Sequence, residues 1–102
     1  MTLVVILTVR MDALEAFRAF ERHAVSVMTV HGGRIERTVV VSPPDAPGLV
    51  EEIHVVTFPD EPAFLAYRGD ARLAALAHLR DAAIVDTEIL AGEDGPSYEA
   101  GA

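Results

Sequence analysis

The stretch LVVILTV, residues Leu3–Val9, decides the fold, because it is an unbroken run of apolar and β-branched residues of strand length. Successive side chains of a strand point to opposite faces of its sheet. One face would carry Leu3, Val5, Leu7 and Val9, and the other would carry Val4, Ile6 and Thr8. Both sets are largely apolar. We therefore expect a strand that is buried on both faces of its sheet.

A long amphipathic helix is expected after this strand. Asp12 and Glu15 have the spacing of a capping box, in which side-chain oxygens accept hydrogen bonds from the first amide groups of a helix. Apolar residues then recur at helical spacing as far as Met28. Gly32-Gly33 should end the helix, since glycine adopts the left-handed conformation that closes one, and His31 lies in the last turn, where a cation is favoured.

The rest of the chain supplies three more strands and a bent helical region. We expect strands over Arg34–Val41, Leu49–Phe58 and Ile84–Leu90. The first two are joined by a short proline-rich loop and should pair as an antiparallel hairpin. Asp60 and Asp70 can each cap a helix, and Gly69 between them breaks the helical region. The sequence predicts an α+β fold: a ferredoxin-like βαββαβ chain with a four-stranded antiparallel sheet and its helices on one face.

Length, composition and charge limit the class of protein. The chain has 102 residues, 51% of them hydrophobic and 24% charged, and we expect one domain over residues 1–91 and a flexible acidic tail over residues 92–102. It contains no Cys, which excludes disulfides and thiolate chemistry. The net charge of −8 has the wrong sign for a nucleic-acid partner. No apolar run is long enough to cross a membrane, so we expect a cytoplasmic protein.

The second face of the predicted sheet needs a cover that the chain itself does not supply. Two helical regions can cover only one face of four strands. A second copy of the protein, packed against the free face about a two-fold axis, is the expected cover. We therefore predict an obligate homodimer.

The alternation in the other strands assigns their side chains to the two faces. We expect the more apolar set under the helices: Ile35, Val39, Val41, Ile53, Val55, Val85 and Ile89. The set expected to face the partner is Arg34, Glu36, Thr38, Val40, Glu52, His54, Val56, Phe58, Ile84, Asp86, Glu88 and Leu90. This second set mixes apolar and ionisable side chains, which suggests a partly enclosed cavity for a small organic ligand.

His54 is the candidate catalytic residue. We expect Glu36 or Thr38 opposite it on the hairpin, and a histidine paired with a carboxylate can act as a general base. The alternative is a structural hydrogen bond within the dimer interface. Tyr67 and Arg68, just before a glycine, are candidates for binding an anionic ligand, although they can equally be a core tyrosine beside a surface arginine.

Other candidates carry weaker chemistry. Asp86, beside Glu88, is a candidate substrate-binding carboxylate, but both are simply solvated if their strand lies at a sheet edge. The four histidines lack the spacing of a preformed metal site, and we expect neither a metal nor a cofactor. The four phenylalanines, Phe17, Phe20, Phe58 and Phe64, are expected in the core.

Several motifs resemble those of the dimeric α+β barrel superfamily, which includes the antibiotic-biosynthesis monooxygenases and families of small uncharacterised proteins. The motifs are the helix Phe17–His31 running into GGRIER at 32–37, TFPD at 57–60, and AYRGD at 66–70 ahead of LAHLR at 76–80. The resemblance implies paired ferredoxin-like protomers, each with a pocket between its sheet and its helices. Haem-degrading and quinone-forming proteins of this kind use Trp and Asn near the pocket, and this chain contains neither, which argues against both activities.

Three functional hypotheses remain open. The preferred one is a homodimer with a small-molecule pocket and no established activity. The second is a cofactor-independent monooxygenase or isomerase-like enzyme that acts on a small aromatic or polyketide-like substrate, with His54 as the base and Arg68 or Tyr67 orienting the anion. The third is a structural or regulatory dimer without a ligand. The sequence leaves open whether the protein is an enzyme.

Overall fold

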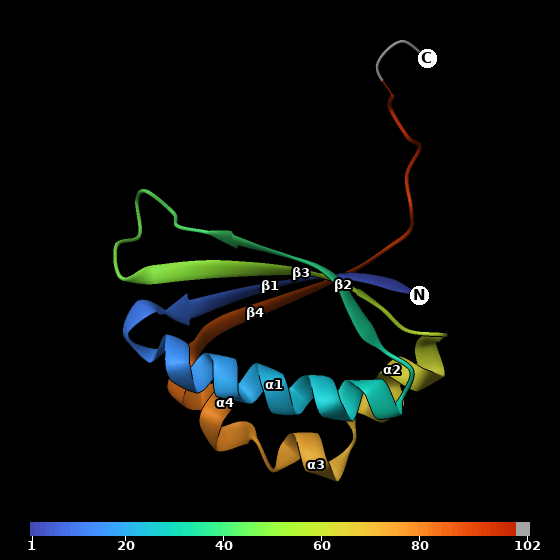
Figure 1. Ribbon diagram of the computed structural model, residues 1–102, viewed down its shortest axis with the longest axis horizontal. Coiled ribbons are helices and arrows are strands. Elements are labelled where there is room, and N and C mark those ends of the chain that lie inside the picture. Colours follow the sequence, from blue (N-terminus) through green and yellow to red (C-terminus); the bar gives the residue numbers. More distant parts are fainter. Residues whose placement is uncertain (100–102) are drawn as a thin grey trace.

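A four-stranded antiparallel sheet forms one layer of the molecule and the helices form the other (Figure 1). The computed structural model describes residues 1–99. The elements in chain order are β1 (Thr2–Arg10), a 3₁₀ turn η1 (Met11–Ala13), α1 (Leu14–Val30), β2 (Arg34–Val41), β3 (Leu49–Thr57), α2 (Glu61–Arg68), α3 (Ala71–Ala74), α4 (Ala77–Ala83) and β4 (Ile84–Gly92). The strand order β2-β3-β1-β4 and the single helical layer confirm the predicted ferredoxin-like fold.

The first strand, β1, is an inner strand of the sheet. β1 pairs with β3 on one side and with β4 on the other. Leu3, Leu7 and Val9 are buried on the helix side. Val4 and Ile6, on the opposite face, are only half-buried, because no helix lies over them.

Helix α1 covers the middle of the sheet with one apolar stripe, formed by Phe17, Phe20, Ala24, Val27 and Met28. The predicted capping box is wrong. Residues Met11–Ala13 form a 3₁₀ turn instead, and Ala13, which has no side-chain oxygen, is the residue that begins the helix. Gly32 has a φ of +75°, so the predicted left-handed end of the helix is confirmed.

Three short helices complete the helical layer. Asp60 accepts a hydrogen bond from the Ala63 amide at 2.9 Å, and Asp70 accepts one from the Arg72 amide at 2.8 Å, so both predicted caps are confirmed. Asp70 also receives a 2.8 Å hydrogen bond from the end of α1, through Nε2 of His31. Asp70 thus both begins α3 and connects the short helices to the end of α1.

The predicted faces of β3 were the wrong way round. His54 pairs across the sheet with Val5, whose side chain faces the helices, and so His54 and Glu52 lie under the helices and not against a partner. Val50, Val56 and Phe58 share that face and are buried. Ile53 and Val55 occupy the free face, by which we mean the sheet face without helices.

The same correction applies to the hairpin partner β2. Val39 lies opposite Ile53 and Val41 opposite Glu51, so both valines belong to the free face. The register shifts between Ile35 and Arg37, and this irregularity leaves Glu36 without a partner residue in β3. A bulge of one residue inverts the facing of everything beyond it, which a strict alternation cannot anticipate.

On β4 the predicted faces hold for Asp86, Glu88, Leu90 and Ile89. Ile84, expected on the partner side, is instead buried at 8% exposure, opposite Val9. Val85, expected under the helices, is 50% exposed at the register shift. The strand runs to Gly92, and residues 93–99 have no regular structure. The remainder of the predicted tail lies outside the described residues.

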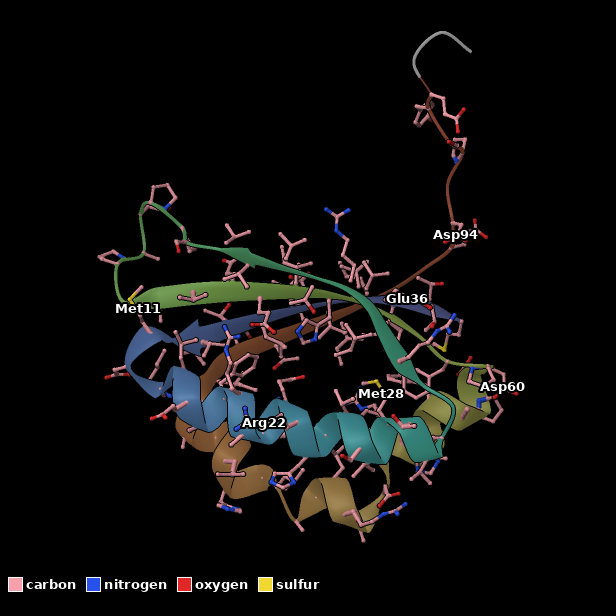
Figure 2. The ribbon with its side chains drawn as sticks, viewed as in Figure 1. Met11, Arg22, Met28, Glu36, Asp60 and Asp94 are labelled. Carbon is pink, nitrogen blue, oxygen red and sulfur yellow. The ribbon has the colours of Figure 1, made fainter. Side chains whose placement is uncertain are left out.

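Side chains project from the free face, above the sheet in Figure 2, and several of the apolar ones are exposed in the single chain. The exposed apolar side chains of this face include Val39, Val41 and Leu90, and Ile6 lies at its centre on β1. Within residues 1–99, no helix is long and apolar enough to cross a membrane.

Candidate functional site

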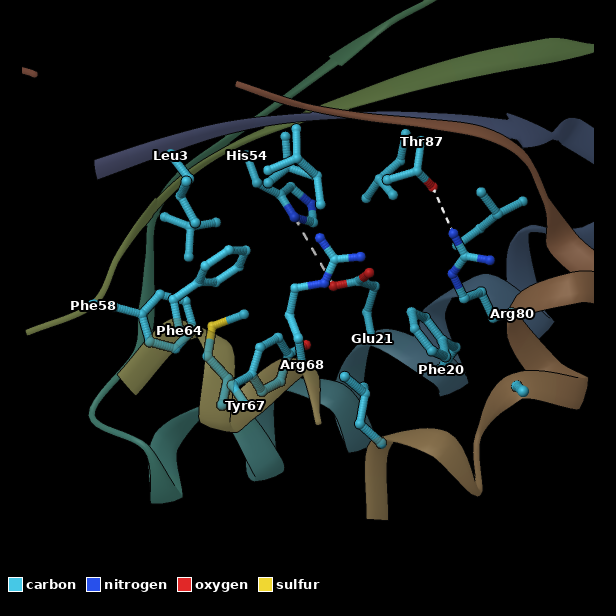
Figure 3. A pocket seen from close by; sticks show the side chains of 18 of the residues that line it. Leu3, Phe20, Glu21, His54, Phe58, Phe64, Tyr67, Arg68, Arg80 and Thr87 are labelled. Atoms are coloured by element: carbon cyan, nitrogen blue, oxygen red, sulfur yellow. Dashed lines mark hydrogen bonds and ion pairs between the residues drawn. The ribbon is translucent and has the colours of Figure 1, made fainter. Parts of the chain in front are cut away.

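A cavity of about 430 Å³ lies between the helix side of the sheet and the helical layer (Figure 3). Its walls are mainly apolar. β1 contributes Leu3 and Val5, while Phe58 and Phe64 form an aromatic corner with their ring centroids 5.4 Å apart. The cavity lies on the opposite side of the sheet from the face where the alternation had suggested it.

Two buried residues of β3, Glu52 and His54, form a hydrogen-bonded pair. The His54 Nε2 atom lies 2.7 Å from the Glu52 Oε1 atom, and the two residues are 4% and 7% exposed. They are two positions apart on one strand, so the pleat points both to the same face. The other carboxylate oxygen of Glu52 lies 3.9 Å from the guanidinium of Arg18 on α1. Glu52 therefore orients the imidazole through a hydrogen bond and forms an ion pair with Arg18.

Glu21 faces the same histidine from α1. Its Oε2 atom is 4.0 Å from the His54 Nδ1 atom, and both side chains line the cavity. Burial raises the pKa of the Glu21 carboxyl above its ordinary value, and the charge of Glu52 raises it further, while the charge of His54 opposes this. The sequence analysis did not single out Glu21. Its spacing of four from Phe17, on the buried stripe of the helix, was the available signal.

Tyr67 and Arg68 both reach the cavity from the end of α2, as Figure 3 shows. The Tyr67 ring packs 5.5 Å from that of Phe58, and the Arg68 guanidinium lies 5.8 Å from the Phe64 ring centroid. Burial, followed by the nearby charge of Glu21, raises the pKa of Tyr67 to about 12. The phenol therefore stays a hydrogen-bond donor at neutral pH.

Arg80 lies at the other end of the cavity and was not recognised from the sequence. Its Nη2 atom donates a 3.1 Å hydrogen bond to the Thr87 hydroxyl, which links α4 to β4 across the cavity wall (Figure 3). Arg80 shares a helix face with Leu73, Leu76 and Ala77, and a cation on an otherwise apolar face was the signal for it.

Two of the predicted binding residues, Glu36 and Asp86, are not among those that line the cavity. Glu36 does not lie opposite His54, where Thr38 stands instead. Its carboxylate accepts a 2.9 Å hydrogen bond from the Thr57 hydroxyl and another from Arg34, and these two bonds lower the pKa of Glu36. Asp86 is exposed on the edge strand β4, in the solvated position that was the alternative interpretation.

Within the described residues, no group of three or more histidines and carboxylates is arranged to hold a metal ion. The site therefore offers acid–base and hydrogen-bonding groups against an apolar wall. Such a set of groups can move a proton and stabilise an organic anion.

No protein-family model matches this sequence, and no curated protein matches it either. Several solved structures are similar in fold. RPA0582, a protein of unknown function from Rhodopseudomonas palustris, is 18% identical with a TM-score of 0.64 over 86% of this chain and 78% of its own. SnoaB, a cofactor-independent oxygenase from Streptomyces nogalater, is 14% identical with a TM-score of 0.62 over 92% and 94%.

An antibiotic biosynthesis monooxygenase is 16% identical, with a TM-score of 0.62 over 94% of this chain and all of its own. Identities this low establish a shared fold and leave the activity open. This chain therefore shares its ferredoxin-like fold with these proteins, an antibiotic biosynthesis monooxygenase among them, in agreement with the resemblance carried by its motifs.

Proposed function

We propose that this protein is a homodimeric enzyme that removes a proton from a small aromatic or polyketide-like carbon acid, with His54 as the general base. The observation that carries the proposal is the Glu52–His54 hydrogen bond of 2.7 Å at the wall of an apolar cavity. A buried histidine held by a carboxylate is oriented for proton transfer. A monooxygenase-like and an isomerase-like enzyme both begin with this step.

The hydrogen bond between Glu52 and His54 determines which imidazole nitrogen can accept the substrate proton. The Glu52 carboxylate accepts a hydrogen bond from the Nε2–H group of His54, so the lone pair of the neutral ring is on Nδ1. Nδ1 is the atom nearer to Glu21, a cavity-lining side chain. Positive charge that develops on the imidazole is stabilised by the buried carboxylate of Glu52.

The deprotonated substrate is an enolate or phenolate and needs a cationic or hydrogen-bonding partner. Arg68 supplies a guanidinium at the cavity, and Tyr67 supplies a phenol that remains protonated at neutral pH. The apolar corner at Phe58 and Phe64 suits an aromatic or alicyclic ring.

The first step is tested by deuterium exchange, using β-tetralone, a ketone with an acidic benzylic methylene group, in D₂O without oxygen. The wild-type protein is expected to accelerate deuterium incorporation at that carbon. His54→Gln should lower the rate by about 100-fold or more, the usual contribution of a general base. His78→Gln is the matched control, because His78 is exposed on α4.

Two results would contradict the proposal: no exchange above the buffer rate with the wild-type protein, or equal exchange with His54→Gln. Binding of β-tetralone without exchange would indicate a ligand-binding protein instead. Oxygen consumption after aeration, dependent on His54, would show that the carbanion passes to dioxygen, which is the cofactor-independent oxygenase branch suggested by the likeness to SnoaB.

The homodimer is supported by the apolar free face and is tested separately. Ile6 is half-buried at the centre of that face, and a lysine there would put a charge into the predicted interface. Ile6→Lys is expected to give a monomer in native mass spectrometry where the wild type gives a dimer. Val30→Lys is the control, because Val30 is 61% exposed at the end of α1. A wild-type monomer would reject the dimer.

A further inference from the structure

Glu21 is a cavity group that the proposed proton abstraction does not use. Its side chain is 20% exposed and projects from α1 toward the sheet, and the ion pair that it forms in the described part of the chain is the 4.0 Å contact with His54 (Figure 3). A carboxyl group held beside an apolar wall, without an arginine or lysine bonded to it, is unusual for a purely structural residue.

Glu21 and His54 approach the cavity from opposite layers. His54 belongs to β3 and Glu21 to α1, and their polar atoms lie side by side at the cavity wall, so a ligand in the cavity can contact both groups along one edge. The separation of 4.0 Å between Oε2 and Nδ1 is too long for a hydrogen bond and short enough for both groups to reach one allylic unit of a ligand. The arrangement gives a base and an acid on the same substrate.

We infer that Glu21 is the proton donor that partners His54, and that the cavity catalyses a 1,3-proton shift, converting a β,γ-unsaturated ketone into its conjugated isomer. This inference rests on the proposed function and names the reaction that follows proton abstraction. It requires neither an oxidant nor a cofactor, because the product has the same atoms and the same oxidation level as the substrate.

The steps balance as follows. His54 Nδ1 takes the proton from the carbon between the carbonyl group and the double bond, and the electron pair of that bond is delocalised as a dienolate. Arg68 stabilises the negative oxygen. The protonated Glu21 carboxyl gives its proton to the γ-carbon, which restores the carbonyl group and forms the conjugated double bond. The imidazolium proton then passes to the Glu21 carboxylate, and both groups regain their starting states.

The surroundings of Glu21 suit a proton donor. Its burial and the charge of Glu52 both raise the pKa of its carboxyl, so the protonated form persists to higher pH than in an exposed glutamate. The charge of His54 on the sheet opposes this rise. Arg68, at the end of α2, lines the same cavity. A donor with a moderately raised pKa is effective near neutral pH.

The test uses cyclohex-3-enone, a small β,γ-unsaturated ketone, without oxygen and in D₂O. Deuterium entering the carbon between the carbonyl group and the double bond reports proton abstraction, and the ultraviolet absorbance of the conjugated ketone reports delivery to the γ-carbon. We expect Glu21→Gln to lower the rate of conjugation by about 100-fold while deuterium incorporation falls by less than about threefold. Glutamine keeps the size of the side chain and cannot donate a carboxyl proton.

Glu15→Gln is the matched control, because Glu15 lies on the exposed face of the same helix. Its rates and melting temperature should match the wild type, and the melting temperature of Glu21→Gln should show that it is folded. Conjugation at the wild-type rate in Glu21→Gln, or equal losses of conjugation and exchange, overturns the role of Glu21. Exchange without any conjugated product in the wild type overturns the isomerisation and leaves proton abstraction standing. Absence of exchange overturns the proposed function itself.

Discussion

Gly33 marks the place where the end of α1 passes closest to the aromatic corner of the cavity. It is buried, and a β-carbon at this position would lie 2.4 Å from Cε1 of Phe58 and 2.6 Å from Cγ of Met28. Real β-carbons do not approach other heavy atoms so closely, so Gly33→Ala must displace one of these side chains. Phe58 belongs to one buried cluster with Leu3, Met28 and Val56, so a displacement of its ring disturbs these contacts.

The cost of Gly33→Ala can be worked from this geometry. Forcing one extra carbon into a well-packed core costs about 1–3 kcal/mol. For a domain of this size, each kcal/mol corresponds to roughly 4–8 °C in melting temperature. We therefore expect a decrease of roughly 5–20 °C, measured by circular dichroism or differential scanning fluorimetry.

Gly69→Ala provides the matched control. Gly69 also ends a helix, but its φ is −89°, and an added β-carbon would meet only the Leu65 carbonyl oxygen at 3.5 Å, an ordinary contact. Its melting temperature should stay within about 3 °C of the wild type, in keeping with a surface change of roughly 0.5 kcal/mol. If Gly33→Ala and Gly69→Ala have the same melting temperature, the chain after α1 is not closely packed against Phe58, and the shape of the cavity corner must be revised.

Two further predictions concern titration. Hydrogen bonds from Arg72 and His31 hold the pKa of Asp70 well below its ordinary value, so its contribution to stability is complete above about pH 4 and is lost as the pH falls further; the melting temperature of the wild type should therefore fall more steeply than that of Asp70→Asn on acidification, and parallel curves would refute this. Burial raises the pKa of Tyr67 to about 12, so spectrophotometric titration of Tyr98→Phe, in which Tyr67 is the one remaining tyrosine, should show a single step near pH 12; a step near the ordinary tyrosine pKa of about 10 would contradict this.

The order of helices and strands could be predicted from the sequence because the apolar patterns and the residues that begin and end the elements indicate the same boundaries. The apolar, β-branched run Leu3–Val9 forms β1, and Asp60 and Asp70 begin α2 and α3, as expected. The capping box at Asp12 failed because a 3₁₀ turn intervenes before the helix. Spacing alone does not distinguish a helix start from a turn that precedes it.

The facing of β3 could not be decided by alternation, because both of its sets contain apolar and ionisable residues. Ile53 and Val55 favoured one choice, but Phe58, expected in the core, shares its face with His54 and favoured the other. In the structure the face that carries Phe58 is the buried one. Glu52 and His54 can be buried on that face because they form a hydrogen bond with each other. A buried polar pair satisfies its own hydrogen bonds, and single-residue patterns do not reveal such a pair.

Of the candidate site, His54, Tyr67 and Arg68 are brought together, while Glu36 and Asp86 are not. The prediction for Glu36 depended on the register of β2, which the shift between Ile35 and Arg37 alters. Asp86 lies on the predicted face of β4, but the cavity is on the other side of the sheet. Tyr67 and Arg68 depended only on a local signal, the glycine that ends their helix.

The helical layer consists of one long helix, α1, and three short ones. The buried pair on β3 and the residues of the short helices can therefore change independently in evolution or design. His54 and Glu52 stand on an inner strand of the sheet, facing the long, well-packed α1. The rest of the helical wall of the cavity consists of the short helices α2, α3 and α4, which are interrupted at Gly69 and again after Ala74. Residues in these pieces can be exchanged or inserted while the rigid part is unaffected. In a molecule arranged this way, the cavity-lining residues of α3 and α4 can diversify among descendants while the Glu52–His54 pair on β3 is inherited intact.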